Sequence, residues 1–257
     1  MLSFILALSI STAHAYEVDN FTDRHTLTQD SLDIMNREVN RILDRAVFEA
    51  NKESPDRCSR AMLRQEIVRW TRPEIVSLLE FWLVLTDDVQ RTSVGLSDSI
   101  YRGVTLTDSP GMWSAGIGRS FLLNGVVVGT DKIGHFFMQG LEYYKSVTED
   151  GHVLEDVLRK EHGEDGVWGL AMTGVKSYAD MTANYDGYRF WSQMFLGRRP
   201  YMRCEQGRRW VHEREFTWAD YVSPAWDEAL NCSDFNAGVA SRVEHNFSER
   251  NLKCPVD

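Results

Sequence analysis

The stretch from Gly129 to Lys145 constrains this chain most, because its hydrophobic pattern fits only one kind of element. After three consecutive valines, apolar residues recur every three or four positions, which is typical of an amphipathic helix. On the opposite face, Asp131, His135 and Glu142 share one stripe, since offsets of four, seven and eleven residues return to within roughly 40° of the same angle. Two acids and a histidine on one stripe are suited to proton transfer, so this helix is the candidate wall of a catalytic cleft.

A solvated face is the alternative interpretation of this polar stripe, because surface helices usually carry charges on their outer side. Two observations favour a covered helix. Its flanks are unusually apolar, with Phe136, Phe137, Met138, Tyr143 and Tyr144. Gly134 and Gly140 also lower the helix propensity, which indicates that another element approaches closely there.

The rest of the chain predicts a mainly α protein with a short β/loop region. Helical periodicity runs through residues 27–52, through two shorter segments before residue 86, and through residues 175–196. Residues 93–129 are richer in Gly, Ser and Thr and predict loops with short extended pieces at Ile100–Leu106 and Phe121–Val128. The length and the absence of a linker favour one domain over residues 16–257.

The first fifteen residues predict export. Residues 1–15 are apolar and end in Ala-His-Ala, which fits the small-x-small pattern of a signal peptide cleavage site. No later stretch is long and apolar enough to span a membrane. We therefore expect a periplasmic or extracellular monomer.

The cysteines fit that compartment. There are four of them and no CxxC spacing, so two disulfides are expected, with all three connectivities open: Cys58, Cys204, Cys232 and Cys254. The net charge of −10 argues against a nucleic-acid partner and against anionic membrane surfaces. An acidic chain suits a neutral or cationic polymer instead.

The segment at residues 175–196 is a second candidate for the cleft. It carries aromatic residues at nearly every helical angle, as buried helices do. Its polar residues therefore need partners: Asp180, Asn184, Asp186 and Arg189. They form either an internal network or, together with Tyr185, the other wall of the cleft that contains Glu142. Tyrosine rings also stack well on sugar rings.

Two chemistries fit these residues, because the sequence contains no P-loop, dinucleotide fingerprint, GxSxG or HExxH motif. In acid catalysis, apolar neighbours would raise the pKa of Glu142, and Asp180 or Asp186 would be the second carboxylate. In a metal-dependent hydrolase, Asp131 and His135 would supply two ligands at i,i+4, with Asp180 or Asp186 completing the set. We favour acid catalysis, with Asp131 and His135 in a structural network near the site and with no metal or cofactor.

Three segments in order resemble the goose-type lysozyme and lytic transglycosylase group. They are Glu142 late in a helix, then Gly169-Leu170-Ala171-Met172, then Ala183-Asn184-Tyr185-Asp186-Gly187. Residues Gly129–Lys145 and Ser177–Trp191 resemble more narrowly the deacetylation-specific lysozymes of predatory bacteria within that group.

This resemblance implies a lysozyme-like helical fold and cleavage of peptidoglycan glycan strands, with Glu142 as general acid. It implies Tyr185 as a further catalytic residue. Beside the resemblance, we expect Asp180 to be catalytic as the partner carboxylate, and Tyr143, Asn184 and Tyr188 to contact the substrate. Whether the product is hydrolysed or an anhydro sugar stays open. Deacetylated glycan carries free amines and is cationic, so an acidic protein would attract it. The competing class is a non-catalytic envelope protein that binds glycan or protein through an aromatic groove.

Overall fold

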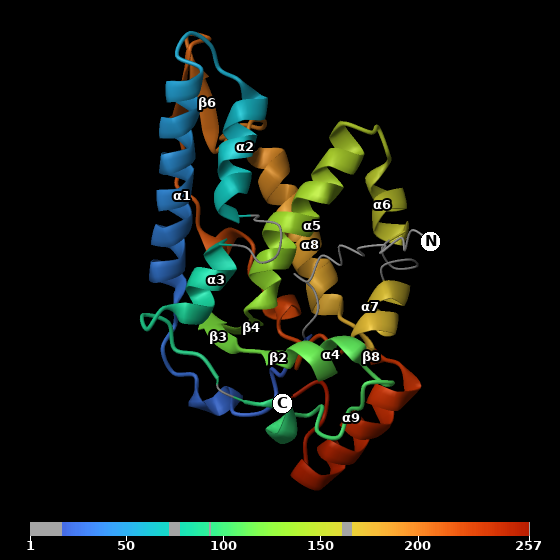
Figure 1. Cartoon of the computed structure of the whole chain (residues 1–257). Helices are drawn as coiled ribbons and strands as arrows, with labels where there is room; N and C mark the ends of the chain where they lie inside the picture. Colours follow the sequence, from blue (N-terminus) through green and yellow to red (C-terminus); the bar gives the residue numbers. More distant parts are fainter. Residues whose placement is uncertain (1–16, 72–77, 93, 161–165, 257) are drawn as a thin grey trace, which may run out of the picture.

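The structure is a computed structural model that describes residues 17–71, 78–92, 94–160 and 166–256 (Figure 1). The predicted signal peptide lies outside the described residues. The fold is mainly helical, as predicted. Its helices are α1 (Leu32–Glu53), α2 (Arg60–Thr71), α3 (Leu78–Leu85), α4 (Pro110–Ala115), α5 (Asp131–Thr148), α6 (Leu154–Lys160), α7 (Gly166–Met172), α8 (Tyr178–Gln193) and α9 (Ala237–Arg250).

The strands form four small two-stranded sheets in the described residues. β1 (Glu17–Val18) pairs in parallel with β2 (Ile117–Gly118), and the other three sheets are antiparallel. These are β3 (Ser120–Leu123) with β4 (Val126–Gly129), β5 (Val175–Lys176) with β8 (Asp234–Phe235), and β6 (Met202–Glu205) with β7 (Arg209–His212). Each strand is short, so the helices make up most of the fold.

One of the two predicted extended pieces is a hairpin, and the other is not extended. β3 and β4 are joined by Asn124 and Gly125, which both have positive φ, as this tight turn requires. The prediction for Ile100–Leu106 was wrong, because this segment forms turns. The side-chain amide of Asn246 on α9 donates to the carbonyls of Ile100 and Arg102, at 2.8 and 3.0 Å. These carbonyls are therefore satisfied without a neighbouring strand.

α5 and α8 pack side by side at the centre of the molecule (Figure 1). They approach so closely that a Cβ on Gly140 would lie 2.5 Å from the backbone of Gly187. The close approach predicted for the glycines of α5 is thus confirmed. Gly134 meets a different neighbour, since a Cβ there would lie 2.8 Å from the carboxyl of Glu80 on α3.

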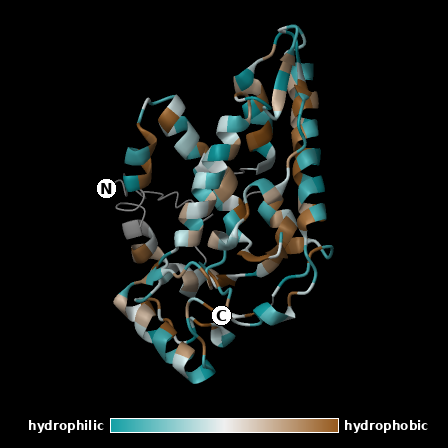
Figure 2. Cartoon of the chain, turned by 180° about the vertical axis from the view of Figure 1, so that it is seen from behind, coloured by the Kyte–Doolittle hydropathy of each residue, from teal (hydrophilic) through white to brown (hydrophobic). Residues whose placement is uncertain are grey.

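The core around this helix pair is aromatic. Phe136 of α5 contacts a ring of partners with centroid distances between 4.9 and 6.2 Å, namely Phe137, Phe190, Phe216, Trp218, Tyr221 and Trp226. Several of them come from the C-terminal part of the chain, which folds back onto the centre. The outer helix α1 is amphipathic, with hydrophobic and hydrophilic residues interleaved along it (Figure 2).

Two disulfides hold this arrangement, as predicted, and the structure defines their connectivity. Cys58 is bonded to Cys204, and Cys232 to Cys254. The first links the segment between α1 and α2 to β6, and the second anchors the segment after α9. Among the described residues, none of the helices has both the length and the apolar character needed to cross a membrane.

Candidate active site

The first turn of α5 contains a fully buried lysine. The Nζ atom of Lys132 lies 2.7 Å from the carboxylate of Asp131, 2.6 Å from that of Asp180 and 2.6 Å from that of Glu228. An ammonium group is tolerated without water only when it is paired in this way. We call Asp131, Lys132, His135, Asp180 and Glu228 the carboxylate cluster.

Three segments far apart in the sequence position this cluster. α5 supplies Asp131, Lys132 and His135, and α8 supplies Asp180. Glu228 follows the 3-10 turn Pro224–Trp226 in the C-terminal part. Ser177 connects two of them, because its hydroxyl accepts from the backbone N–H of Asp180 at 3.2 Å and donates to Glu228 at 2.9 Å. This serine caps the N-terminus of α8 and thereby fixes Asp180 beside Glu228.

His135 lies at the more open rim of the cluster. Its Nδ1 is 3.0 Å from the side-chain oxygen of Asn184, and its Nε2 is 3.3 Å from Oδ2 of Asp180. An amide oxygen only accepts hydrogen bonds, so Nδ1 is the protonated ring nitrogen and donates the hydrogen bond to Asn184. The side chains of His135 and Asp180 are 14% and 18% exposed, whereas the other members are almost completely buried. The cluster is therefore most accessible to solvent at these two residues.

Two carboxyl groups of the cluster, those of Glu228 and Asp131, hold protons unusually well. Burial is the main cause that raises the pKa of Glu228 to about 7, and the charges of Asp180 and Asp131 raise it further while Lys132 lowers it. Burial also raises the pKa of Asp131. Burial lowers the pKa of Lys132, but the surrounding carboxylates raise it well above its usual value, so the ammonium stays charged.

Two more acids lie close to the cluster. Burial, followed by the charges of Asp180 and Glu228, raises the pKa of Glu17 well above its usual value. Burial and the charge of Asp131 raise the pKa of Glu80 to about 9. The protein thus concentrates protonatable carboxyl groups around one lysine, which is typical of functional sites.

The structure brings together four of the residues that the sequence singled out. Asp131, His135, Asp180 and Asn184 all belong to the cluster or contact it. The polar stripe of α5 becomes more exposed along the helix, and Glu142 at its far end is 50% exposed and lies 3.3 Å from Lys145. The apolar surroundings expected for Glu142 are not found, because helical angle determines the direction of a side chain and not its depth.

The aromatic residues of α8 divide between the core and the surface. Tyr185 is exposed and its ring stacks on that of Tyr188 at 6.3 Å, whereas Tyr143 on α5 is buried. Tyr185 also lines a hollow of about 660 Å³ together with Tyr178, Met181 and Thr182 of α8 and with residues of α6. Asp180 and Tyr185 are five residues apart and so project roughly 140° apart on the helix. This hollow and the cluster therefore open on different sides of α8.

Asp186 belongs to an internal network. It accepts from Arg189 at 2.6 Å and from the indole N–H of Trp226 at 2.9 Å. This confirms the network interpretation for Asp186 and Arg189. Of the two aspartates considered as partner for the α5 stripe, only Asp180 faces it.

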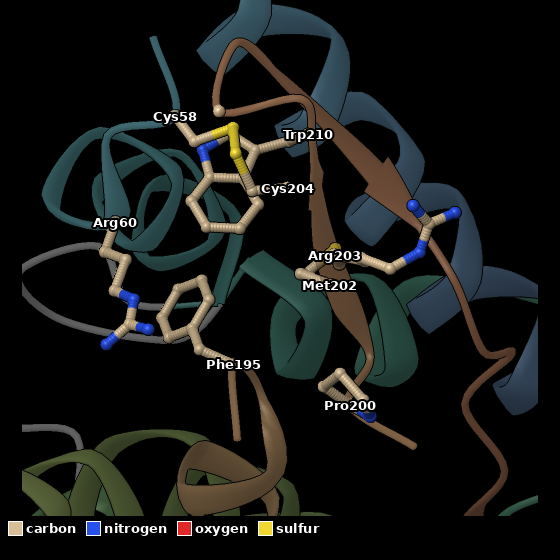
Figure 3. A pocket seen from close by; sticks show the side chains of 9 residues that line it. Cys58, Arg60, Phe195, Pro200, Met202, Arg203, Cys204 and Trp210 are labelled. Carbon is tan, nitrogen blue, oxygen red and sulfur yellow. A yellow bond between two sulfur atoms is a disulfide. The ribbon is translucent and has the colours of Figure 1, made fainter. Parts of the chain in front are cut away.

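A second hollow, of about 360 Å³, lies beside the Cys58–Cys204 disulfide (Figure 3). The rings of Phe195 and Trp210 and the side chain of Arg60 line it. Its lining residues include neither a carboxylate nor a histidine among those that the structure describes. It offers no groups for acid–base chemistry, and we place the candidate site at the carboxylate cluster.

Sequence reasoning missed Lys132 and Glu228. Lys132 precedes the core residue Phe136 by one helical turn, and this position beside the apolar face is a signal of burial that could have been used. Glu228 carries no such signal, because it lies in an irregular segment. Comparison with known proteins gives no match: no protein-family model, no curated protein and no solved structure matches this chain.

Proposed function

We propose that this chain is an exported hydrolase that cleaves peptidoglycan glycan strands, with a lysozyme-like helical fold and Asp180 as one of two catalytic carboxylates. The observation that carries the proposal is the position of Asp180, which is partly exposed and lies between the ammonium of Lys132 and the imidazole of His135. Lys132 favours the ionised form of this carboxylate, as a group that activates water requires. The sequence resemblance supplies the substrate class.

The second carboxylate of the proposal is Glu142. Seven residues separate it from His135, so along the axis of α5 the two are roughly 10 Å apart and point in similar directions. In this scheme Glu142 gives its proton to the leaving oxygen, and Asp180 removes a proton from the attacking water.

The test is clearing of purified peptidoglycan sacculi by the protein and by two variants. Glu142→Gln and Asp180→Asn keep the shape of each side chain and remove its acid–base function, so each should lower the clearing rate at least about 100-fold. Asp156→Asn is the matched control, because Asp156 is also an exposed helical acid paired with the basic residue three positions later, Arg159. It should clear at the rate of the unmodified protein.

Either of two results would contradict parts of this proposal. If Asp180→Asn abolishes clearing and Glu142→Gln does not, the acid is not Glu142 and the chemistry is confined to the cluster. If the folded, unmodified protein clears no sacculi, the chain is not a glycan hydrolase and the non-catalytic binding class is favoured. Circular dichroism of each variant shows that the fold is kept.

The net charge of −10 leads to a further prediction about the substrate. Chemically deacetylated sacculi carry free amines, so an acidic enzyme should bind and clear them faster than native sacculi at low ionic strength. The difference should shrink as salt is added, because salt screens the attraction. Slower clearing after deacetylation would show that the acetyl groups are needed and would contradict the charge argument.

A further inference from the structure

We infer that Asp131, His135 and Asp180 form a binding site for one divalent transition-metal cation. One potential ligand atom from each of the three residues lies within 4.8 Å of the others. Such a spacing lets all three atoms reach a single ion after small side-chain adjustments, since metal–nitrogen and metal–oxygen bonds are about 2.0–2.2 Å long. The inference does not rest on the proposed glycan hydrolysis.

The orientation of the imidazole is the first argument. Nδ1 of His135 donates to the oxygen of Asn184, which is itself 4% exposed. A metal-ligating histidine typically donates its second ring N–H to an oxygen in this way, and that bond selects the tautomer. With Nδ1 protonated, a neutral ring directs the lone pair of Nε2 toward Oδ2 of Asp180, 3.3 Å away. A metal cation placed between these two atoms would accept both lone pairs.

The charge of the cluster is the second argument. Three carboxyl groups contact the single ammonium of Lys132, so oxygen ligands and negative charge are concentrated at one place. A dication beside His135 would interact favourably with these groups and would favour their ionised forms.

The oxygen atoms of the two aspartates allow Lys132 and a cation to bind together. Lys132 contacts Oδ2 of Asp131 and Oδ1 of Asp180. Oδ2 of Asp180 points the other way, toward His135. Asp180 can therefore bridge the ammonium on one side and a metal ion on the other, and the second oxygen of Asp131, Oδ1, accepts from the backbone N–H of Lys132 at 2.9 Å. Lys132 thus holds these side chains in place and does not fill the site.

The donor set indicates the class of cation. One imidazole nitrogen with two carboxylate oxygens suits Zn²⁺, Mn²⁺ or Fe²⁺, whereas Ca²⁺ and Mg²⁺ prefer oxygen alone. Thiolates do not compete, because all four cysteines form disulfides. Three protein ligands leave positions for water, as in catalytic metal sites.

The test is calorimetric titration of the chelator-treated protein with Zn²⁺ and, separately, with Mn²⁺ at about pH 7.5, where metal-ligating histidines are deprotonated. We expect one ion per chain. His135→Gln and Asp131→Asn should each weaken binding at least about 100-fold. His212→Gln is the matched control: this histidine also contacts an aspartate, Asp44 at 2.7 Å, without belonging to a three-ligand group among the described residues. It should bind as the unmodified protein does.

A second readout identifies the ligand atom. In nitrogen-15 spectra of the imidazole rings, Zn²⁺ should shift the Nε2 resonance of His135 and leave its Nδ1 protonated. The inference is overturned if the unmodified protein binds neither ion at a single site, or if His135→Gln binds as tightly as His212→Gln. Both readouts are taken without glycan, so failure of the sacculus assay would not affect them, and loss of metal binding would not by itself abolish the proposed hydrolysis.

Discussion

Glu80 is a residue whose protonation changes strongly between the unfolded and the folded chain. It is 1% exposed on α3 and faces Gly134 of α5, and its pKa rises from 4.5 to about 9 on folding because of burial and the charge of Asp131. Between these two values the folded chain binds a proton that the unfolded chain has released. The contribution of Glu80 to the free energy of unfolding is therefore fully present below pH 4.5 and is lost as the pH rises toward 9.

The variant Glu80→Gln tests this pH dependence of stability, since glutamine keeps the shape of the glutamate side chain and cannot ionise. Relative to the variant, the unmodified protein should lose about 1.4 kcal/mol of unfolding free energy per pH unit between about pH 5.5 and pH 8.5. Urea unfolding at several pH values measures the difference. As a control, Glu66→Gln removes an equally buried acid that is paired with Arg69 at 2.9 Å, and it should not stabilise the protein. Parallel pH curves for Glu80→Gln and the unmodified protein would show that Glu80 is ionised in the fold.

At the same scale, the sequence predicted which residues of α5 face the site but not how deeply they lie. The shared stripe of Asp131, His135 and Glu142 follows from helical geometry alone. The depth of each residue depends on segments elsewhere in the chain, such as the one that brings Glu228 onto Lys132 from 96 positions away. No local pattern reports such a contact, so the position of Glu228 and the exposure of Glu142 could not be read from periodicity.

At the scale of elements, the crossing of α5 and α8 determines the geometry of the site, because each helix supplies part of it. Two glycines face each other there, Gly140 and Gly187. A side chain at either position would separate the helices and move Asp180 away from His135. The crossing therefore requires glycine at both positions, and the stability of a substituted variant tests this requirement.

Gly187→Ala should destabilise the protein by about 2–4 kcal/mol, because the added Cβ would overlap the carbonyl oxygen of Phe136 in a core that cannot easily yield. Gly95→Ala is the matched control. Gly95 has an ordinary φ of −90° and no atom within 4 Å of an added Cβ, so this change should be almost neutral. Thermal unfolding distinguishes the two. Equal stability of both variants would show that α5 and α8 adjust freely.

The long helices were predictable for a physical reason, and the short strands were not. α1, α5 and α8 are long enough for their apolar period to repeat several times within one element. The two-residue strands β1, β2, β5 and β8 contain no repeat at all. Their pairing depends on partners that only the folded chain brings together.

At the scale of the whole molecule, the two disulfides close loops of very different length. Cys58 and Cys204 are 146 residues apart, whereas Cys232 and Cys254 are 22 apart. A crosslink stabilises a fold largely by restricting the unfolded chain, and this effect grows with the logarithm of loop length. The longer loop contains α5, α8 and most of the carboxylate cluster.

Replacing Cys58 and Cys204 together by alanine should therefore lower the unfolding free energy by about 3–5 kcal/mol. The paired alanine replacement of Cys232 and Cys254 should lower it by roughly 1.5 kcal/mol less, from the ratio of the loop lengths. Urea unfolding of both double variants under the same conditions gives the comparison. A larger loss from the shorter loop would show that local packing around Cys254 outweighs chain entropy.

Glu228 has a consequence for the order in which the carboxylate cluster can form. Synthesis runs from the N-terminus, and the third carboxylate on Lys132 comes 96 residues after it. A growing chain therefore contains the sequences of α5 and α8 before it contains Glu228. The cluster can reach its final form only after the C-terminal part of the chain has been made.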